Sequence, residues 1–341
     1  MAGTRIVAGS VAGLAFLLAA LATGVLVGPA RLGLADVVAA LASHVPLLGL
    51  ESPLGETESA IVFELRLPRV VLGALVGATL ALSGAAYQGV FRNPLADPYL
   101  LGVAAGAGLA ASAVIAYGPP GASSSIVLPA AAFAGAAGAV ALTYALGRAG
   151  GRGATGLILA GVTVAAFLTA LQTFVQQQRA ERIQDVYAWL LGQLETAGWQ
   201  QVLIALPYMT ISATVILAHR RMLNVLRVGE EEAASLGVNV ERVRLLVIVA
   251  ATVGTAAAVA VSGLIGFVGI IVPHAIRLTL GASYRVLLPL SILIGAGFLV
   301  FADVLAKSAL APAELPIGVV TAFFGAPFFA LVLRTTRTVG S

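Results

Sequence analysis

The chain has 341 residues, of which 60% are hydrophobic and only 10% are charged, and its formal net charge is +4. This composition, with a mean hydropathy of +1.02, indicates a protein that lies in a lipid bilayer and gives no reason to expect a nucleic-acid partner. Cysteine is absent, which excludes disulfides and thiolate chemistry. The single lysine, Lys307, follows Ala306, so it cannot belong to a phosphate-binding P-loop, which needs Lys directly after Gly. Any ATP-driven step therefore needs an ATPase on another chain.

Long apolar runs follow one another along the whole sequence. A helix that crosses a bilayer needs about 20 predominantly apolar residues. The sequence therefore predicts an all-α polytopic membrane protein with about ten such helices in a single transmembrane domain, residues 1–341. The first run is longer than the core of a signal peptide, so we expect it to be retained. The predicted spans are 6–27, 69–90, 98–117, 125–147, 155–175, 200–218, 243–262, 264–280, 286–306 and 316–333.

Glycine and proline punctuate several of these spans. Gly73 with Gly77, and Gly102 with Gly106, form small-residue steps that predict close helix packing in lipid. Four residues are expected to break the short span 264–280: Gly263, Gly266, Gly269 and Pro273.

The basic residues predict the orientation. Thirteen of the 19 Lys and Arg residues fall on one side of the membrane when the N-terminus is placed in the cytoplasm. Cytoplasmic loops carry the excess of basic residues, so we expect both termini inside. Residues 176–199 then form an outer loop, in which Trp189 and Trp199 predict a short helix anchored at the interface. Residues 28–65 give no indication of their role.

The most informative inner loop spans residues 223–238. Gly229 and Gly237 bracket a short predicted helix, and residues 230–232 place acidic side chains in its first turn, where the helix dipole favours them. Ala233 and Leu236 are three residues apart and are expected on one face. Two interpretations stay open here: a knob that fits a cleft in another protein, or a loop helix that packs on its own bundle.

Several ordered motifs resemble the type II ABC importer permeases for vitamin B12, haem and ferric siderophores. The pattern Gly229-xxx-Ala233-xx-Leu236-Gly237 resembles the coupling helix of that family. Four further segments agree with it, and the resemblance runs from about residue 60 to the C-terminus: 66–69, 93–98, 266–269 with 273–274, and 314–321 with 325–327.

The resemblance implies a permease fold, partners and an energy source. The chain would be the membrane permease subunit of an ATP-driven importer in the bacterial inner membrane. Its partners would be a second copy of itself, two ATP-binding cassette subunits, a solute-binding protein and membrane lipid. Two permeases would enclose one path along their shared axis and work by alternating access. The permease would be no enzyme and would hold no cofactor or metal. Its substrate stays open among ferric siderophore, haem and cobalamin, with siderophore as the first candidate.

The resemblance also assigns roles to residues at the two ends of the spans. Three basic residues would receive acidic side chains of the binding protein, a role that bidentate Arg–carboxylate contacts suit: Arg66, Arg69 and Lys307. Five loop residues would couple the ATPase: Gly229, Glu230, Ala233, Leu236 and Gly237. The residues alone leave alternatives open, since Arg66 and Arg69 could snorkel at the interface and Lys307 could pair with Asp303.

A gate and a path are implied between those ends. The family places a narrow inner gate at positions that match Asn93, Pro94, Leu95, Ala154 and Thr155. Small and apolar groups suit such a constriction, although Ala154 stands where some relatives carry a hydroxyl, which argues against a hydrogen-bonded gate. An ordinary Asn-Pro turn is the alternative. Polar groups inside a bilayer should face other helices or a water-filled path, and three are predicted near the path: Tyr87, Gln88 and Gln172.

An ion-gradient-driven secondary transporter is the alternative class. It usually needs ionisable residues embedded in the membrane, and only Asp303 and Glu314 lie near a span, both towards the outer end. His274 is single and follows a proline, so we expect a buried, hydrogen-bonded histidine and not a metal ligand.

Overall fold

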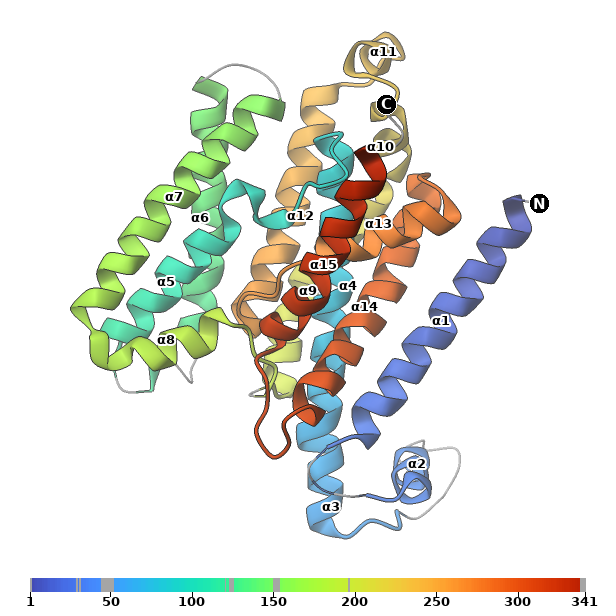
Figure 1. Ribbon diagram of the computed structural model, residues 1–341, viewed down its shortest axis with the longest axis vertical. Coiled ribbons are helices and arrows are strands. Elements are labelled where there is room, and N and C mark those ends of the chain that lie inside the picture. Colours follow the sequence, from blue (N-terminus) through green and yellow to red (C-terminus); the bar gives the residue numbers. More distant parts are fainter. Residues whose placement is uncertain are drawn as a thin grey trace.

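A computed structural model describes residues 2–28, 30, 32–43, 52–119, 121–122, 126–149, 154–195 and 197–337. Within these ranges the chain forms helices and connecting loops and no β-strand, which confirms the predicted all-α class. The long helices run roughly along the vertical axis of Figure 1, with α11 at one end of the molecule and α2 and α3 at the other. We refer to these as the α11 end and the α3 end.

The helices follow one another in the predicted order. Their bounds are α1 (Ala2–Leu26), α2 (Leu34–Ser43), α3 (Glu56–Ala60), a π-helical segment (Ile61–Arg66), α4 (Leu67–Val90), a 3-10 segment (Pro98–Leu101), α5 (Val103–Tyr117), α6 (Val127–Ala149), α7 (Ala154–Gln178), a 3-10 turn (Ala180–Arg182), α8 (Ile183–Leu190), α9 (Trp199–Ala218), α10 (Arg220–Leu226), α11 (Glu230–Ser235), α12 (Val240–Ser262), α13 (Val268–Leu280), α14 (Tyr284–Ser308) and α15 (Ile317–Arg337).

All ten predicted spans coincide with apolar helices. Among the described residues, seven helices are long and apolar enough to cross a membrane, and the shorter apolar helices α5, α13 and α15 occupy the other three positions. The second span differs from its predicted bounds, because α3, the π-helical segment and α4 form one continuous helix of 35 residues, Glu56–Val90. At 1.5 Å per residue it is about 50 Å long, more than the ~30 Å hydrocarbon core of a bilayer. Arg66 and Arg69 therefore lie within a helix and not in a loop before it.

The central helix is α4, which packs against α9, α12, α13 and α14. Every residue from Thr79 to Val90 is buried. Its glycines allow backbones to touch: a Cβ at Gly77 would lie 2.2 Å from the carbonyl oxygen of Gly295, and one at Gly84 would lie 2.1 Å from that of Gly269. Lipid gives helices no hydrophobic drive to associate, so such close contacts hold the bundle together.

Two groups of helices flank this centre in Figure 1. On one side α5, α6 and α7 pack on each other, and on the other side α1 packs along α14. The α5–α6 contact is as close as those of α4, because a Cβ at Gly106 would lie 2.2 Å from the carbonyl oxygen of Gly135. The packing predicted for Gly77 and Gly106 is therefore confirmed. Gly102 instead precedes α5 with a φ of +85°.

Two sequence expectations need correction. The chain breaks between α12 and α13, at residues 263–267, but Gly269 and Pro273 lie inside the continuous helix α13. Trp189 on α8 is 5% exposed and belongs to the hydrophobic core, so it does not anchor the helix at an interface. Trp199 at the start of α9 is partly exposed, and its indole N–H donates to the carbonyl oxygen of Phe63 at 2.9 Å.

Candidate functional site

The loop predicted to couple an ATPase forms a capped knob at the α11 end. Gly229 precedes α11 with a φ of +152°, and Gly237 ends it with a φ of +80°. Glycine reaches these left-handed conformations without the steric cost of a Cβ. The backbone N–H groups of Gly237 and Val238 donate to the carbonyls of Ala234 and Ala233, at 2.9 and 3.0 Å, which satisfies the last helical carbonyls. The predicted helix bounds are confirmed.

The two faces of this knob differ from the prediction. Ala233 is fully buried, whereas Leu236 is 70% exposed and Val228 is 67% exposed. Ala233 and Leu236 therefore do not share one face, because the helix ends before Leu236 and the chain turns at Gly237. Glu230 forms an ion pair with Arg244 of α12, which ties the knob to the bundle. The knob packs on its own bundle through Ala233 and still presents apolar side chains outwards.

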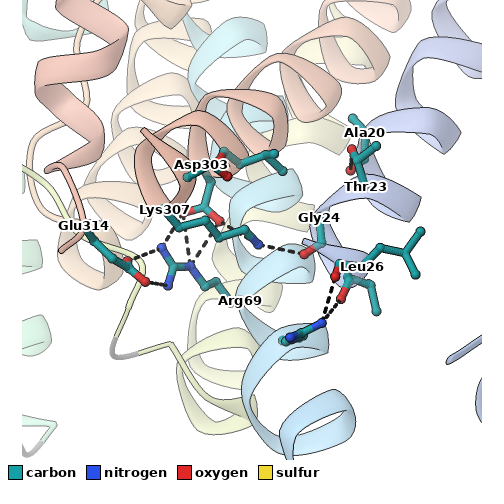
Figure 2. A network of polar contacts seen from close by, with 12 residues as sticks. Ala20, Thr23, Gly24, Leu26, Arg69, Asp303, Lys307 and Glu314 are labelled. Carbon is teal, nitrogen blue, oxygen red and sulfur yellow. Dashed lines mark hydrogen bonds and ion pairs between the residues drawn. The ribbon is translucent and has the colours of Figure 1, made fainter. Parts of the chain in front are cut away.

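A network of charged groups links α4, α14 and the start of α15 towards the α3 end (Figure 2). The guanidinium of Arg69 donates from Nη2 to Asp303 Oδ1 at 2.8 Å and to Glu314 Oε2 at 2.7 Å. Its Nε and Nη1 make further bonds of 3.1 Å to the same carboxylates. Lys307 Nζ lies 3.9 Å from Asp303 Oδ2 and donates to the carbonyl oxygen of Gly24 at 2.7 Å. Two cations thus balance two carboxylates.

Arg66 serves the end of α1 in a similar way. Its Nη1 donates to the carbonyl oxygens of Val25 and Leu26, each at 2.9 Å, and its Nη2 donates to that of Ala30. The last carbonyls of a helix lack intrahelical partners, and Arg66 supplies these donors. Arg66 is 7% exposed and Lys307 is 6% exposed.

The three residues predicted as docking contacts therefore donate their hydrogen bonds to acceptors of the same chain. Arg66 and Lys307 are both buried and bonded within the chain. For Lys307, the structure contains the alternative pairing with Asp303. Sequence reasoning missed the pairing of Arg69, because its carboxylate partners lie more than 200 positions away. A docking role for these residues stays a prediction.

The polar residues predicted near the path join helices of the same chain. Tyr87 is 1% exposed, and its hydroxyl lies 2.9 Å from that of Thr252 on α12. Gln88 is 2% exposed and donates from Nε2 to the carbonyl oxygen of Gly269 at 3.0 Å. Gln172 on α7 is half-buried and lies against Gly108 of α5. Tyr87 and Gln88 are enclosed by their own chain. A place near the path stays a prediction for all three residues.

The residues predicted for an inner gate lie in two separate elements. Asn93 Oδ1 accepts from the backbone N–H of Leu95 at 2.9 Å, the geometry of an Asn-Pro turn, and Pro94 is exposed. Ala154 and Thr155 open α7, where Ala154 is half-buried and Thr155 is exposed. Among the described residues, no hydrogen bond joins the turn at Asn93 to the start of α7. The gate stays a prediction.

His274 departs from its expectation. Its ring packs edge-on against that of Phe328, with centroids 5.9 Å apart, and its Nδ1 is buried without a hydrogen-bond partner. The described residues contain no cluster of His, Cys, Asp or Glu that could hold a metal ion.

A feature that sequence reasoning missed is a basic cavity at the α11 end. Its volume is about 290 Å³, and its lining includes Arg92 after α4, Arg227 after α10 and Arg277 in the last turn of α13. Arg227 donates to the carbonyl oxygen of Ala282 at 2.9 Å, and Arg277 donates to the side-chain oxygen of Gln88. The only sequence signal was that all three arginines fall on the predicted inner side.

These features define a class of protein: a multi-span helical membrane permease with a small exposed knob at one end. Comparison with known proteins identifies its family. The chain belongs to the FecCD transport family, whose family model matches residues 16–335. Its relatives are named as permease subunits of ABC transporters, which makes the chain a non-catalytic transport component.

Relatives with named substrates support this assignment. The chain is 47% identical to the cobalamin import system permease protein of Halobacterium salinarum, over 82% of this chain and 74% of that protein. It is 39% identical to the Fe(3+)-citrate import permease YfmD of Bacillus subtilis, over 84% of each chain. It is also 39% identical to the hemin transport permease of Yersinia pestis, over 80% of this chain and 83% of that one.

A solved structure shares the fold over almost the whole chain. It is described as an inward-facing conformation of a metal-chelate type ABC transporter, with a TM-score of 0.83 and 29% identity. The match covers 98% of this chain and 99% of that one.

Proposed function

We propose that this chain imports a metal chelate, and that cobalamin is the substrate to test first. The observation that carries the proposal is the identity of 47% to a cobalamin permease, against 39% to the Fe(3+)-citrate and hemin permeases. This moves cobalamin ahead of ferric siderophore, which was the first candidate only as the commonest cargo that the resemblance implies. All three cargoes are large chelates of a metal.

The proposed transport unit contains two copies of the chain around one path. The family resemblance assigns Ala154 and Thr155 to a gate on the shared axis, and both lie at the start of α7. The same helix leaves Leu159, Phe167 and Phe174 between 59% and 68% exposed. We therefore place α7 towards the second copy, where its outward face would line or close the path. Alternating access would open that path to one side at a time.

An ATPase subunit would bind the knob at residues 223–238 and drive the conformational change from there. Exposed Leu236 and Val228 offer the apolar anchors that protein interfaces use, while buried Ala233 and the Glu230–Arg244 pair transmit movement to α12. With the N-terminus in the cytoplasm, as the basic residues predict, the α11 end faces the cytoplasm. The start of α1 and the end of α15 would then lie on this same inner side.

The paired state of the membrane-embedded charges argues against an ion-coupled transporter. Such a transporter needs an ionisable group that is free to exchange an ion. Asp303 is instead engaged by both Arg69 and Lys307, and Glu314 is engaged by Arg69.

The substrate is tested by uptake in cells that lack the native chain. Cells complemented with the chain and its partner subunits should accumulate radiolabelled cobalamin, and excess unlabelled cobalamin should compete. Hemin and ferric citrate serve as the matched comparisons. Accumulation of labelled hemin or labelled ferric citrate, with no accumulation of labelled cobalamin, would reject cobalamin and keep the importer class.

A further inference from the structure

We propose that the basic cavity at the α11 end is a binding site for a phosphate group. The phosphate would come from the headgroup of an anionic phospholipid or from inorganic phosphate. The lining also includes Gln88 and Pro94, which the family resemblance assigns to the path and the inner gate. The proposal does not depend on the identity of the cargo.

Three helix ends build the cavity. Arg92 follows α4, Arg227 follows α10, and Arg277 lies in the last turn of α13, so residues 185 positions apart in sequence line one space. Tyr284 lines the same space at the start of α14. The cavity volume of about 290 Å³ far exceeds the ~30 Å³ that one water occupies in the liquid. A phosphate and part of its attached group would fit.

The charge of the cavity is unbalanced. Its lining residues include three arginines and no carboxylate. Across the part of the chain that the structure describes, none of the ion pairs involves Arg92, Arg227 or Arg277. Like charges that share one space repel each other, and this repulsion favours an anion between them. Phosphate suits such a site, because a guanidinium can bind two of its oxygens at once.

Two of the three guanidiniums are already held in place. Arg277 donates to the side-chain oxygen of buried Gln88, and Arg227 donates from Nη1 to the carbonyl oxygen of Ala282 at 2.9 Å. A guanidinium has five N–H donors, so each keeps others for a ligand. Arg92 is exposed, and its φ of +50° fixes the turn that ends α4. Two arginines held by hydrogen bonds and a third on a fixed turn form a largely prepared site.

The position of the cavity favours a lipid as the source. Basic pockets between transmembrane helices on the cytoplasmic side bind acidic headgroups, and this cavity lies where α4 and α13 end. Arg227 is also two residues before Gly229, the start of the coupling knob. A phosphate bound to Arg92, Arg227 and Arg277 would brace the knob against α4 and α13. Lipid composition would then affect how firmly the knob is held.

The test is a binding measurement on the purified full-length chain after delipidation. Native mass spectrometry and thermal unfolding would compare three probes: phosphatidylglycerol, phosphatidylcholine and inorganic phosphate. We expect one retained phosphatidylglycerol per chain, and no comparable retention of phosphatidylcholine. Stabilisation by phosphatidylglycerol alone would identify a lipid headgroup, and stabilisation by millimolar phosphate would identify the free ion. Retention of neither anion above the level of phosphatidylcholine would overturn the proposal, and the arginines would then serve only the carboxyl ends of their helices.

A pair of charge-matched variants locates the site. Arg92→Gln with Arg227→Gln should weaken binding at least about tenfold, the loss expected for one charge-assisted hydrogen bond. The control, Arg220→Gln with Arg221→Gln, removes the same charge from exposed residues outside this cavity at the same end. An equal loss in the control would show non-specific attraction and contradict the site. If the double variant fails to fold, two single variants at Arg92 replace it. Loss of phosphatidylglycerol binding in Arg92→Gln, with a less than tenfold loss in the charge-preserving Arg92→Lys, supports the site. Full binding of phosphatidylglycerol by Arg92→Gln refutes it.

Discussion

The charged network towards the α3 end and the basic cavity at the α11 end treat their basic residues in opposite ways. Towards the α3 end, Arg69 and Lys307 share Asp303, and Arg69 also binds Glu314, so cations and carboxylates balance. At the α11 end, Arg92, Arg227 and Arg277 line one cavity that contains no carboxylate. The first arrangement is complete within the chain. The second leaves charge for something that the chain does not supply.

This difference teaches what each end is built to do. A buried ion pair contributes little net stability, yet removing one partner leaves an expensive unpaired charge. The network of the α3 end therefore fixes α1, α4, α14 and α15 relative to each other. The α11 end combines the open cavity with the knob at residues 223–238, which exposes Val228 and Leu236 and which we propose couples an ATPase. Helix α4 carries both Arg69 and Gln88 and connects the two ends rigidly.

The largest effect is expected from breaking the balanced network. Arg69→Ala would leave Glu314 without its cation and Asp303 with Lys307 alone, and should cost about 3–5 kcal/mol of stability. Thermal unfolding in detergent would measure the loss. The control is the fourfold change Arg69→Met, Asp303→Leu, Lys307→Met and Glu314→Gln, which removes all four charges together and should be much less destabilised. A stable Arg69→Ala variant would show that the network does not hold the helices.

The coupling knob should respond in function and not in folding. Leu236→Asp places a charge on a side chain that is 70% exposed, so unfolding should not change. If Leu236 is an interface anchor, ATPase binding should weaken by about 2–4 kcal/mol. Titration of the ATPase subunit onto the solubilised permease would measure this loss. Leu236→Met is the apolar control and should bind normally, and normal binding by Leu236→Asp would remove the anchoring role.

The connection through α4 is tested with a single methyl group. Gly84→Ala would place its Cβ 2.1 Å from the carbonyl oxygen of Gly269, and such overpacking costs about 1–3 kcal/mol. Gly138 on α6 is the matched control, because a Cβ there meets nothing within 4 Å. Gly138→Ala should leave stability unchanged or raise it by about 0.5–1 kcal/mol. Equal unfolding temperatures for the two variants would contradict the close α4–α13 contact.

The smallest change would make the α11 end resemble the α3 end. Gln88→Glu adds a carboxylate beside Arg277 and gives the cavity the internal counter-ion that it lacks. Binding of phosphatidylglycerol should weaken by about tenfold, because one cation would be neutralised. Gln88→Met, which removes the hydrogen bond without adding charge, serves as the comparison. Unchanged lipid binding by Gln88→Glu would break the contrast between the ends.

Much of the fold could be predicted from the sequence because its signals are local. Apolar runs of about 20 residues, long enough to cross a bilayer as helices, predicted the spans. Gly229 and Gly237 marked the ends of α11, because glycine reaches the backbone conformations needed there. The close contact at Gly77 also followed from a local pattern of small residues. The motifs spread from about residue 60 onwards then indicated the family.

The misplaced features depend on residues that are distant in sequence. Arg69 meets Asp303 across 234 positions, so no local pattern could distinguish this buried pair from a free docking residue. Ala233 and Leu236 differ in burial because the chain leaves the helix between them, which the spacing of three residues does not reveal. The basic cavity likewise exists only where three separate helices end together.

The most direct test of the account concerns the source of energy. The purified chain would be placed in proteoliposomes with its ATPase and binding-protein partners, and cobalamin uptake would be measured with ATP and no ion gradient. We predict uptake with ATP, and none when a proton or sodium gradient is applied without ATP. Uptake by the chain alone on such a gradient would contradict the central claim.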